Sequence, residues 1–584
     1  MRLLRASLHK AYYSVMAPKA RMPFPPVKKG WGDLLILALL SGLVIGFIFY
    51  GMEFFGPIHK EVKIELSTVR LPEYAFFSFS RAIVAYAFSF VFSLVIGFWA
   101  AKDRAAEKVI IPLLDILQSI PILGFMPGVV LLLVSLFSKT NIGLELAAII
   151  LMFTSQAWNM AFGVYQSVRT VPEEKEECAT IYKINYWKRV RWVEFPCTIH
   201  SLVWNSIMSV AGGWFFLMVN EAFKLGDRNF QIPGLGSFMS VAAARRDIPA
   251  MIEAIVMMVL LIIFIDQFIW RPLVVWSQKF RVEETAPTLI AESWFLNVLK
   301  NSYLVNGVRL VVHGYRNFIQ NRKAKKVPEK KSIGSIFLVI SRAFLLVLIA
   351  LLVAAAFYLF FEIRTVSFSH WLYLGKMFLL TFGRVIFCLV VSVLVGLPLG
   401  LMIGLSEKLT KILQPLIQIT ASFPATLLFP IIIYILMVVG IPLGYGSMVL
   451  MLTGSIWYVF FNVIAGARAL PSDLREVAAN FHYSLPRRFI SLYLPGIFPF
   501  FVTGLVNASG GAWNASIVAE YVTYKQQVYT TPGLGSAISM AAQEGNIPNL
   551  VASVLVMMVI VACINYNVWL RIYHYSEKRF ALNY

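Results

Sequence analysis

The sequence predicts an all-α protein that crosses a membrane about twelve times, as two parallel repeats of six helices. Three observations support this fold class. Of the 584 residues, 59% are hydrophobic and only 14% are charged, whereas soluble domains carry roughly 25% charged residues. Apolar runs of about 18 to 25 residues, the length that spans a bilayer as a helix, recur along the chain. Many residues also recur at a fixed offset of 299 or 303 positions.

The apolar runs divide into two sets of six. The predicted spans lie near 32–52, 82–101, 119–138, 143–166, 199–221 and 250–275, and then near 334–360, 385–405, 417–440, 446–466, 497–519 and 549–570. The predicted organisation is a basic N-terminal tail (1–30), a first repeat (31–280), a basic linker (281–333) and a second repeat (334–584). Since six is an even number, both repeats enter from the same side and have the same orientation.

The net charge of +21 is distributed over alternate loops, so it does not indicate a nucleic-acid partner. The basic residues that fall on one side include Arg2, Lys19, Lys28, Lys102, Arg104, Lys108, Lys183, Lys188, Arg189, Lys408, Lys411, Arg487, Arg488, Lys578 and Arg579. The positive-inside rule makes this side the cytoplasm. We therefore expect both termini to be cytoplasmic. About thirty polar and basic residues precede the first apolar run, which predicts an uncleaved anchor.

Single residues support the duplication. Trp158, Arg169, Pro172, Trp214, Glu221 and Pro233 recur 299 positions later as Trp457, Arg468, Pro471, Trp513, Glu520 and Pro532. Upstream the offset is 303 positions, which matches Arg81 to Arg384, Gly97 to Gly400 and Pro121 to Pro424. The pentapeptide PGLGS also occurs twice, at 233–237 and 532–536.

Two polar stretches with the same spacing interrupt the apolar pattern. Residues 176–196 read EECATIYKINYWKRVRWVEFP, and residues 475–495 read REVAANFHYSLPRRFISLYLP. Apolar residues recur in both at roughly helical spacing, which predicts a short amphipathic helix on the membrane face. Two interpretations remain at this point. The exposed side binds a partner, or the helix packs only against its own spans.

The stretches resemble the EAA loop of ABC-transporter permeases, the membrane subunits of binding-protein-dependent importers. Glu177, Cys178, Ala179 and Pro196 match the Glu-Ala-Ala and the distal proline of that pattern in the first repeat, and Glu476, Val477, Ala478 and Pro495 match them in the second. Lys183 and His482 stand where the family has glycine. The resemblance implies that each loop forms a coupling helix, and that two ABC ATPase subunits dock on the cytoplasmic side.

The resemblance covers nearly all of both repeats, apart from the first and seventh spans and the linker. The segments LLDILQSIPILGFMP and LIQITASFPATLLFP are similar to permeases of the nitrate, sulfonate and taurine importer group, and the doubled layout resembles the duplicated permeases of anion importers. This implies a type I ABC importer permease fold, a small anion as substrate, an extracytoplasmic solute-binding protein and a location in the cytoplasmic (inner) membrane.

Motifs for catalysis are missing from the sequence. It contains no GxxxxGK[ST] phosphate loop, which predicts that ATP and magnesium bind to a separate ATPase subunit. The four cysteines, Cys178, Cys197, Cys388 and Cys563, are scattered without CxxC pairing, so we expect neither a disulfide nor a metal site. The chain is therefore predicted to be a transport subunit without enzymatic activity or a cofactor of its own.

Polar residues inside predicted spans are candidates for the substrate pathway, because such groups usually face a protein interior or a watery cavity. They are Gln118, Ser119, Gln156, Asn159 and Asn205 in the first repeat, and Ser422, Ser455, Asn462, Asn507, Ser509 and Asn514 in the second. Hydrogen bonding between helices is the alternative role for each. Arg81 and Arg384 have an anion-attracting role as one option, but the sequence favours anchors that snorkel to the interface.

The topology places the PGLGS loops outside. Pro-Gly favours a turn with positive φ at glycine, and Asp247 and Asn546 are suited to cap the helices that follow. These loops are interpreted either as receptor-docking or gating elements or as plain turns. The glycines Gly396, Gly400 and Gly404 are predicted to form a close helix-packing face.

Two interpretations of other classes remain. One is an ion-coupled secondary transporter built from parallel repeats, against which the sequence shows no obvious buried cluster of Asp, Glu or His in the middle of a span for ion coupling. The other is a membrane scaffold without transport. The linker segment SWFLNVLKNSYLVNGVRLVVHGYRNFIQ is either an interfacial helix on anionic lipid or a solvated connection with one surface helix.

Overall fold

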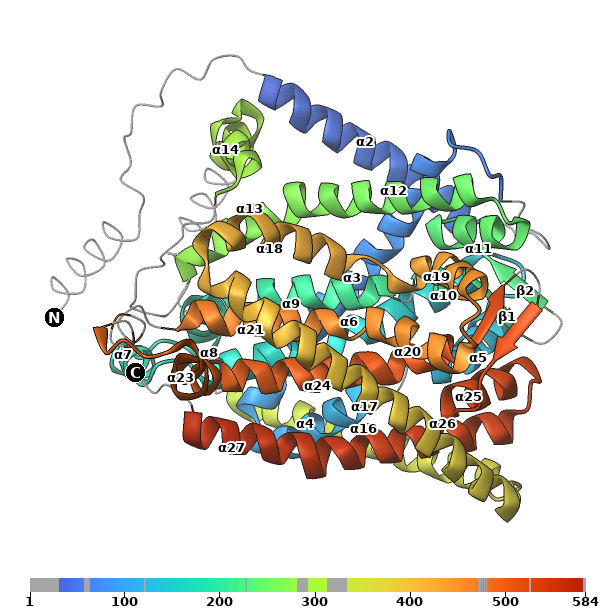
Figure 1. Cartoon of the computed structure of the whole chain (residues 1–584). Helices are drawn as coiled ribbons and strands as arrows, with labels where there is room; N and C mark the ends of the chain where they lie inside the picture. Colours follow the sequence, from blue (N-terminus) through green and yellow to red (C-terminus); the bar gives the residue numbers. More distant parts are fainter. Residues whose placement is uncertain are drawn as a thin grey trace, which may run out of the picture. The chain divides into compact units, whose positions relative to one another are not determined.

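The computed structural model of the chain describes residues 31–56, 64–119, 122–215, 217–225, 228–280, 292–311, 333–470, 474, 476, 478, 480–524 and 527–580. The described residues form two compact units. Residues 31–47 and 292–311 belong to a small unit, and the other described residues belong to a large one. The large unit contains the described residues of both repeats apart from residues 31–47. Figure 1 labels the helices and strands of the chain.

The first repeat is a succession of helices. They are α3 (Leu71–Lys102), α4 (Arg104–Ser119), α5 (Ile122–Leu136), α6 (Ile142–Arg169), α7 (Glu173–Ile181), α8 (Tyr186–Arg189), α9 (Phe195–Phe215), α10 (Leu217–Glu221), α11 (Leu235–Arg245), α12 (Ile248–Ile265) and α13 (Arg271–Ser277). Short π-helical segments, Val190–Glu194 and Asp266–Trp270, precede α9 and α13.

The second repeat follows the same order, except that α20 and α21 together correspond to α6, and α24 corresponds to α9 and α10. Its helices are α17 (Phe368–Leu405), α18 (Glu407–Ser422), α19 (Ala425–Val439), α20 (Leu443–Thr453), α21 (Ile456–Ala469), α23 (Leu485–Arg488), α24 (Leu494–Ala519), α25 (Leu534–Gln543), α26 (Ile547–Ile564) and α27 (Leu570–Phe580). Each repeat begins with one further long helix, α2 (Trp31–Phe54) in the first and α16 (Ile333–Ile363) in the second. The duplicated, predominantly helical fold is confirmed.

Two short β-hairpins were not predicted from the sequence. Strands β1 (Ala222–Leu225) and β2 (Arg228–Gln231) pair antiparallel, as do β3 (Tyr521–Tyr524) and β4 (Gln527–Thr530). Both hairpins begin directly after a predicted span ends. The segments YVTY and QVYT are rich in aromatic and β-branched residues, which favour strands over helices.

Nine helices of the described residues are long and apolar enough to cross a membrane, or ten if the bent pair of residues 416–422 and 425–439 forms one span. The other two predicted spans correspond to α5 and α9. Helix α5 has 15 residues, which is about 22 Å and shorter than the roughly 30 Å of hydrocarbon. Helix α9 carries the polar sequence TIHS and further serines, which lower its mean hydropathy.

A break before the third core span explains the short helices. Helix α18 ends at Ser422, α19 begins at Ala425, and the two meet at an angle of 86°. Pro424 lies in this break, where it disfavours a helical conformation for the residue before it. In the first repeat, α4 ends at Ser119 and α5 begins at Ile122. The predicted span 417–440 is therefore the end of an amphipathic helix followed by a short apolar one.

Glycines allow the core helices to approach closely. A Cβ atom on Gly97 of α3 would lie 2.7 Å from Val164 of α6. In the second repeat, Cβ atoms on Gly396, Gly400 and Gly404 of α17 would lie 2.9, 2.8 and 2.6 Å from side chains of α21. The predicted helix-packing face of these glycines is confirmed.

The hydrophobic core is continuous across the duplication. One cluster of buried residues contains Met126 and Leu151 of the first repeat together with Val385 and Trp513 of the second. The two repeats therefore pack as one body in the large unit. Most apolar side chains of α16 are exposed instead, which is expected of a helix surrounded by lipid.

The small unit contains the helical part of the linker. Helix α14 (Trp294–Asn301) is capped by Ser293, whose hydroxyl accepts a hydrogen bond from the Leu296 amide. Residues 303–311 are also helical. Asp33 Oδ1 accepts a 2.5 Å hydrogen bond from the Ser302 hydroxyl. The predicted surface helix is thus present, while residues 312–332 of the linker lie outside the described part.

Candidate functional site

The first polar loop, residues 173–194, contains α7, a tight turn, α8 and a π-helical segment. The Ile184 amide donates to the Ala179 carbonyl and the Lys183 amide donates to the Thr180 carbonyl, each at 2.9 Å. These two bonds form the Schellman motif, which needs a left-handed residue after the helix. Lys183 occupies that place with a φ of 48°. A lysine thus makes the break that glycine makes in the family pattern.

The second polar loop, residues 472–493, has the same turn in its described part. The Tyr483 amide donates to the Ala478 carbonyl at 3.1 Å, and His482 has a φ of 49°. A left-handed conformation costs a non-glycine residue roughly 1–2 kcal/mol. Both repeats retain this strained turn, so the absence of glycine does not remove the break.

The two loops expose the same kinds of groups. Glu177, Cys178 and Glu476 are exposed, whereas Ala179 and Ala478 are buried beneath them. Val477 lies outside the described residues, and Pro196 and Pro495 occupy the second position of α9 and α24. Apolar side chains that are more than half exposed are Ile181, Tyr182, Trp187 and Trp192 in the first loop and Phe481, Leu485 and Ile490 in the second. The described part of the chain leaves these apolar side chains uncovered.

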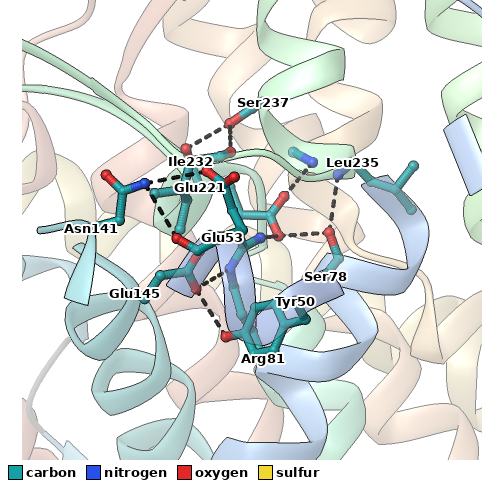
Figure 2. A network of polar contacts seen from close by, with 11 residues as sticks. Tyr50, Glu53, Ser78, Arg81, Asn141, Glu145, Glu221, Ile232, Leu235 and Ser237 are labelled. Carbon is teal, nitrogen blue, oxygen red and sulfur yellow. Dashed lines mark hydrogen bonds and ion pairs between the residues drawn. The ribbon is translucent and has the colours of Figure 1, made fainter. Parts of the chain in front are cut away.

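A buried arginine, Arg81, lies at the centre of a polar network in the part of the first repeat away from its polar loop (Figure 2). Arg81 is 0% exposed and donates from Nε and Nη2 to the Glu145 carboxylate, both at 2.6 Å. Its Nη1 donates to Glu221 Oε1 at 2.8 Å. Hydroxyl groups of Tyr50 and Ser78 donate to the same two carboxylates. Arg81 is therefore the centre of a buried ion-pair network.

The second repeat contains a simpler version of this network. Arg384 Nη1 donates to Glu520 Oε1 at 2.6 Å, and Nη2 donates to the Thr531 hydroxyl at 2.9 Å. Gly444 lies 299 positions after Glu145, so the second carboxylate is missing here. The prediction that Arg81 and Arg384 are interface anchors is wrong, because each guanidinium is buried against a carboxylate.

The same glutamates hold the PGLGS segments. The Gly236 amide donates to Glu221 Oε2 at 2.7 Å, and the Gly535 amide donates to Glu520 Oε2 at 2.8 Å. Each carboxylate thereby lies at the N-terminus of a helix, where the helix dipole favours negative charge. Sequence analysis noted that Glu221 and Glu520 recur but assigned them no role. The recurrence of a glutamate with an arginine in both repeats was the available signal.

The turn in PGLGS differs from the prediction. Gly234 and Gly533 have φ angles of 174° and 175°, which is extended backbone, so the predicted positive φ is wrong. Glycine is required for another reason. A Cβ atom on either residue would lie 2.2 Å from a carboxylate oxygen of the buried glutamate. The predicted caps are confirmed, since Asp247 and Asn546 accept from the amides three residues later.

Several predicted pathway residues lie between helices of their own repeat. Asn159 donates to the Ser209 hydroxyl at 3.1 Å, and Asn205 donates to the Ser201 carbonyl at 3.1 Å. Ser455 and Asn462 donate to backbone carbonyls of their own segment. Both polar side-chain atoms of Gln156 are buried without a hydrogen-bond partner among the described residues. Gln156 is thus the candidate with unused hydrogen-bonding capacity.

The remaining candidates are dispersed. Gln118 is exposed near the end of α4, and the side chain of Ser119 lies outside the described part. Ser509 is buried and Asn507 is half-buried in α24. The roles of all these residues in a pathway stay predictions.

In each repeat an asparagine of one helix faces a glycine of its neighbour, but the two repeats place the asparagine on different helices of the pair. A Cβ atom on Gly163 of α6 would lie 2.1 Å from the Asn205 amide nitrogen of α9, so the asparagine fills the place opposite glycine. In the second repeat, Asn462 of α21 takes that place opposite Gly504 of α24. Asn462 and Gly504 lie 299 positions after Gly163 and Asn205. In both repeats the asparagine side chain therefore fills the space that the facing glycine leaves open between the two helices.

Other polar residues join the two repeats to each other. Asn514 Oδ1 accepts from the Ile122 amide at 3.1 Å, and the Thr426 hydroxyl donates to the Phe215 carbonyl at 2.7 Å. Each contact joins the first turn of a short span, α5 or α19, to the other repeat. Among the predicted pathway residues, Asn514 therefore lies at the boundary of the repeats.

Two acid–amide contacts cross the same boundary. Gln418 donates to Asp266 Oδ1 at 3.2 Å, and Asn565 donates to Asp115 Oδ1 at 2.8 Å. The offsets of 303 and 299 make the two contacts equivalent, with both acids in the first repeat and both amides in the second. A small cavity beside the first contact has room for about one water molecule. Asp266, Gln418, Ser422, Trp214 and Trp270 line it.

Replacing Asn565 by Asp should destabilise the protein by about 1–3 kcal/mol, since the new carboxylate would face Asp115 across the boundary. Thermal unfolding of the detergent-purified protein measures the loss. The double variant Asn565→Asp with Asp115→Asn restores an acid–amide pair in the reverse direction and should recover most of the stability. Equal stability of the single and double variants would contradict the coupling.

Comparison with known proteins agrees with this arrangement. A family model described as "Binding-protein-dependent transport system inner membrane component" matches residues 93–269 and 396–581, which is more than half of the chain, once in each repeat. Bicarbonate transport system permease protein CmpB of Synechococcus elongatus is 29% identical over 101 residues, or 17% of this chain and 34% of that protein. CmpB of Synechocystis sp. is 30% identical over 100 residues, with the same shares. The matched part therefore spans about a third of these relatives. With its duplicated helical fold and a family match in each repeat, the chain belongs to the binding-protein-dependent transport system inner membrane components.

Proposed function

We propose that the chain is a fused pair of permease domains of an ATP-driven importer for a small anion. The observation that carries this proposal is the pair of polar loops, which share a strained turn and expose a glutamate beside apolar side chains. Two ABC ATPase subunits bind these loops on the cytoplasmic side, one to each repeat. A solute-binding protein docks on the other side, and ATP with magnesium binds to the ATPase subunits.

The substrate class rests on similarity. The relatives described above are named as bicarbonate transport permeases, and bicarbonate, nitrate and sulfonates are all small anions. The arginine networks do not conflict with this proposal, since Glu145 and Glu221 share Arg81 and Glu520 is paired with Arg384. Glu145 and Glu221 lie at the ends of the predicted spans 143–166 and 199–221, so they do not form a cluster in the middle of a span. Their pairing with arginine favours a structural role over ion coupling.

The mechanism follows from the contacts between repeats. Closure of the ATPase subunits moves the two polar loops, and the repeats tilt against each other at the boundary formed by α4, α5, α18 and α19. Apolar packing and the polar contacts described above join the repeats at this boundary, so alternate opening of a path to each side requires those contacts to change.

The reconstituted permease alone should hydrolyse no ATP and should take up no labelled bicarbonate or nitrate. Addition of an ABC ATPase and a solute-binding protein from neighbouring genes should produce ATP-dependent uptake. The reason is that the chain lacks a phosphate-binding loop. ATP hydrolysis by rigorously pure permease would refute the assignment of energy supply to a separate subunit.

Both PGLGS segments should be extracytoplasmic, and the linker should be cytoplasmic. Residues within the PGLGS segments such as Leu235 and Leu534 are buried. Labels are therefore introduced at Ala244 and Glu544, which are exposed at the ends of the helices that follow. In a background with all four cysteines replaced by serine, a membrane-impermeant maleimide should modify single cysteines introduced at these two positions in intact spheroplasts. A cysteine introduced at Arg309 should react only after lysis. The reverse pattern would overturn the topology.

A further inference from the structure

A chain of ion pairs ties the first polar loop to helix α3. Glu194, in the π-helical segment before α9, is 0% exposed. Its Oε1 accepts from Lys102 Nζ and, at 3.1 Å, from Arg189 Nε. Arg189 Nη2 lies 2.9 Å from Glu176 Oε1. The last residue of α3 is thereby connected to α7, the helix that carries Glu177.

The buried carboxylate makes this connection obligatory. Glu194 Oε2 is buried without a hydrogen-bond partner among the described residues, so Lys102 and Arg189 are needed to stabilise its charge. Burial, followed by the Glu194 carboxylate, raises the pKa of Tyr186 in the same loop. Removing one partner of a buried ion pair is strongly destabilising because the other charge stays buried.

The second repeat has no equivalent network in its described part. Leu405 and Tyr493 occupy the positions of Lys102 and Glu194, and both pack against the large hydrophobic cluster. Arg488 corresponds to Arg189, but its Nε donates to the Tyr483 carbonyl at 2.8 Å within the loop itself. The position of Glu176 is occupied by Arg475, which cannot pair with another arginine.

Helix α3 extends the connection in the first repeat. Arg81 and Lys102 lie on the same helix, separated by about 32 Å for 21 helical residues. Arg81 binds Glu221, which in turn binds the Gly236 amide of the PGLGS segment. Charged contacts and one helix thus join the polar loop to the PGLGS segment at the far end of the repeat.

We propose that the two polar loops are not equivalent, and that the first loop moves with α3 as one body whereas the second loop, which has only apolar packing in place of these ion pairs, follows α17 less closely. This inference rests on the proposed function, since it assigns the transmission of ATPase movement mainly to the first loop. Lys102, Arg189 and Glu194 are positioning residues in this scheme. The ATPase at the first loop controls transport, and the one at the second loop contributes mainly to docking.

Hydrogen exchange on the permease alone tests the mechanical part. The variants are Glu194→Gln and the double change Lys102→Leu with Glu194→Tyr, which installs the residues of the second repeat and leaves no unpaired buried charge. Peptides covering 173–181 should exchange at least fivefold faster in both variants, while peptides covering 480–493 stay unchanged. Tyr493→Phe is the matched control and should alter neither loop. Unchanged exchange at 173–181 would overturn the inference.

A reconstituted complex tests the transmission. The double variant keeps Glu177 and Trp187, so the ATPase should still co-purify, but stimulation of ATP hydrolysis by the solute-binding protein should fall at least fivefold. Tyr493→Phe should retain normal stimulation. Normal stimulation in the double variant would overturn the inference while leaving the proposed function intact. Failure of the wild-type permease to bind the ATPase would instead refute the proposed function. The hydrogen-exchange experiment would still show whether the ion pairs of Glu194 hold the first loop to α3.

Discussion

Replacing Arg81 by Met should remove most folded protein from the membrane, with a loss of about 3–5 kcal/mol in stability. The variant leaves the carboxylates of Glu145 and Glu221 buried at 0% exposure without their cation. Fluorescence size-exclusion chromatography of membrane extracts and thermal unfolding measure the effect. Arg384→Met leaves only Glu520 unpaired, so we expect a smaller loss in the second repeat.

The two carboxylates of the first network should differ in importance. Glu145→Gln leaves one arginine and one glutamate, which is the arrangement that the second repeat has with Gly444 in the corresponding place. We expect it to be tolerated. Glu221→Gln weakens the contacts to Arg81, Ser78 and the Gly236 amide together and should destabilise more. Equal effects of both variants, or normal abundance of Arg81→Met, would contradict the structural role of the network.

Replacing Glu177 or Glu476 by Lys should weaken ATPase docking at one repeat without unfolding the permease. Both side chains are exposed, and each carboxylate can accept a charge-assisted hydrogen bond from a basic group of the partner, typically about 1.5–3 kcal/mol. Such a loss corresponds to roughly a tenfold to hundredfold weaker interaction. Co-purification of the ATPase and stimulated ATP hydrolysis measure it.

Matched controls exist on the same helices. Glu174→Lys changes an exposed residue of α7, and Asn480→Lys changes an exposed residue of the second loop. Both controls should assemble normally. We also expect Glu177→Lys to reduce stimulated hydrolysis more than Glu476→Lys, because the first loop is tied to α3. If both variants keep wild-type assembly and transport, the coupling role of these glutamates must be abandoned.

The sequence determined the parts of this protein that depend on local composition and repetition. Apolar runs, the offsets of 299 and 303 positions and the doubled EAA pattern were enough to predict a duplicated helical membrane protein of the importer permease family. Caps such as Asp247 and Asn546 were also predictable, because a cap interacts with amides only three residues away. The close-packed glycines of α17 followed from their four-residue spacing.

The tertiary structure decided which polar residues meet. Arg81 and Glu221 lie 140 positions apart, so no local pattern distinguishes a buried ion pair from an interface anchor. The extended backbone at Gly234 was unpredictable for the same reason, since the side chain that excludes a Cβ atom comes from Glu221. Asp115 and Asn565, or Lys102 and Glu194, likewise become partners only when the helices pack. Burial makes these pairings necessary, because a charge removed from water must find its counter-charge wherever the fold places it.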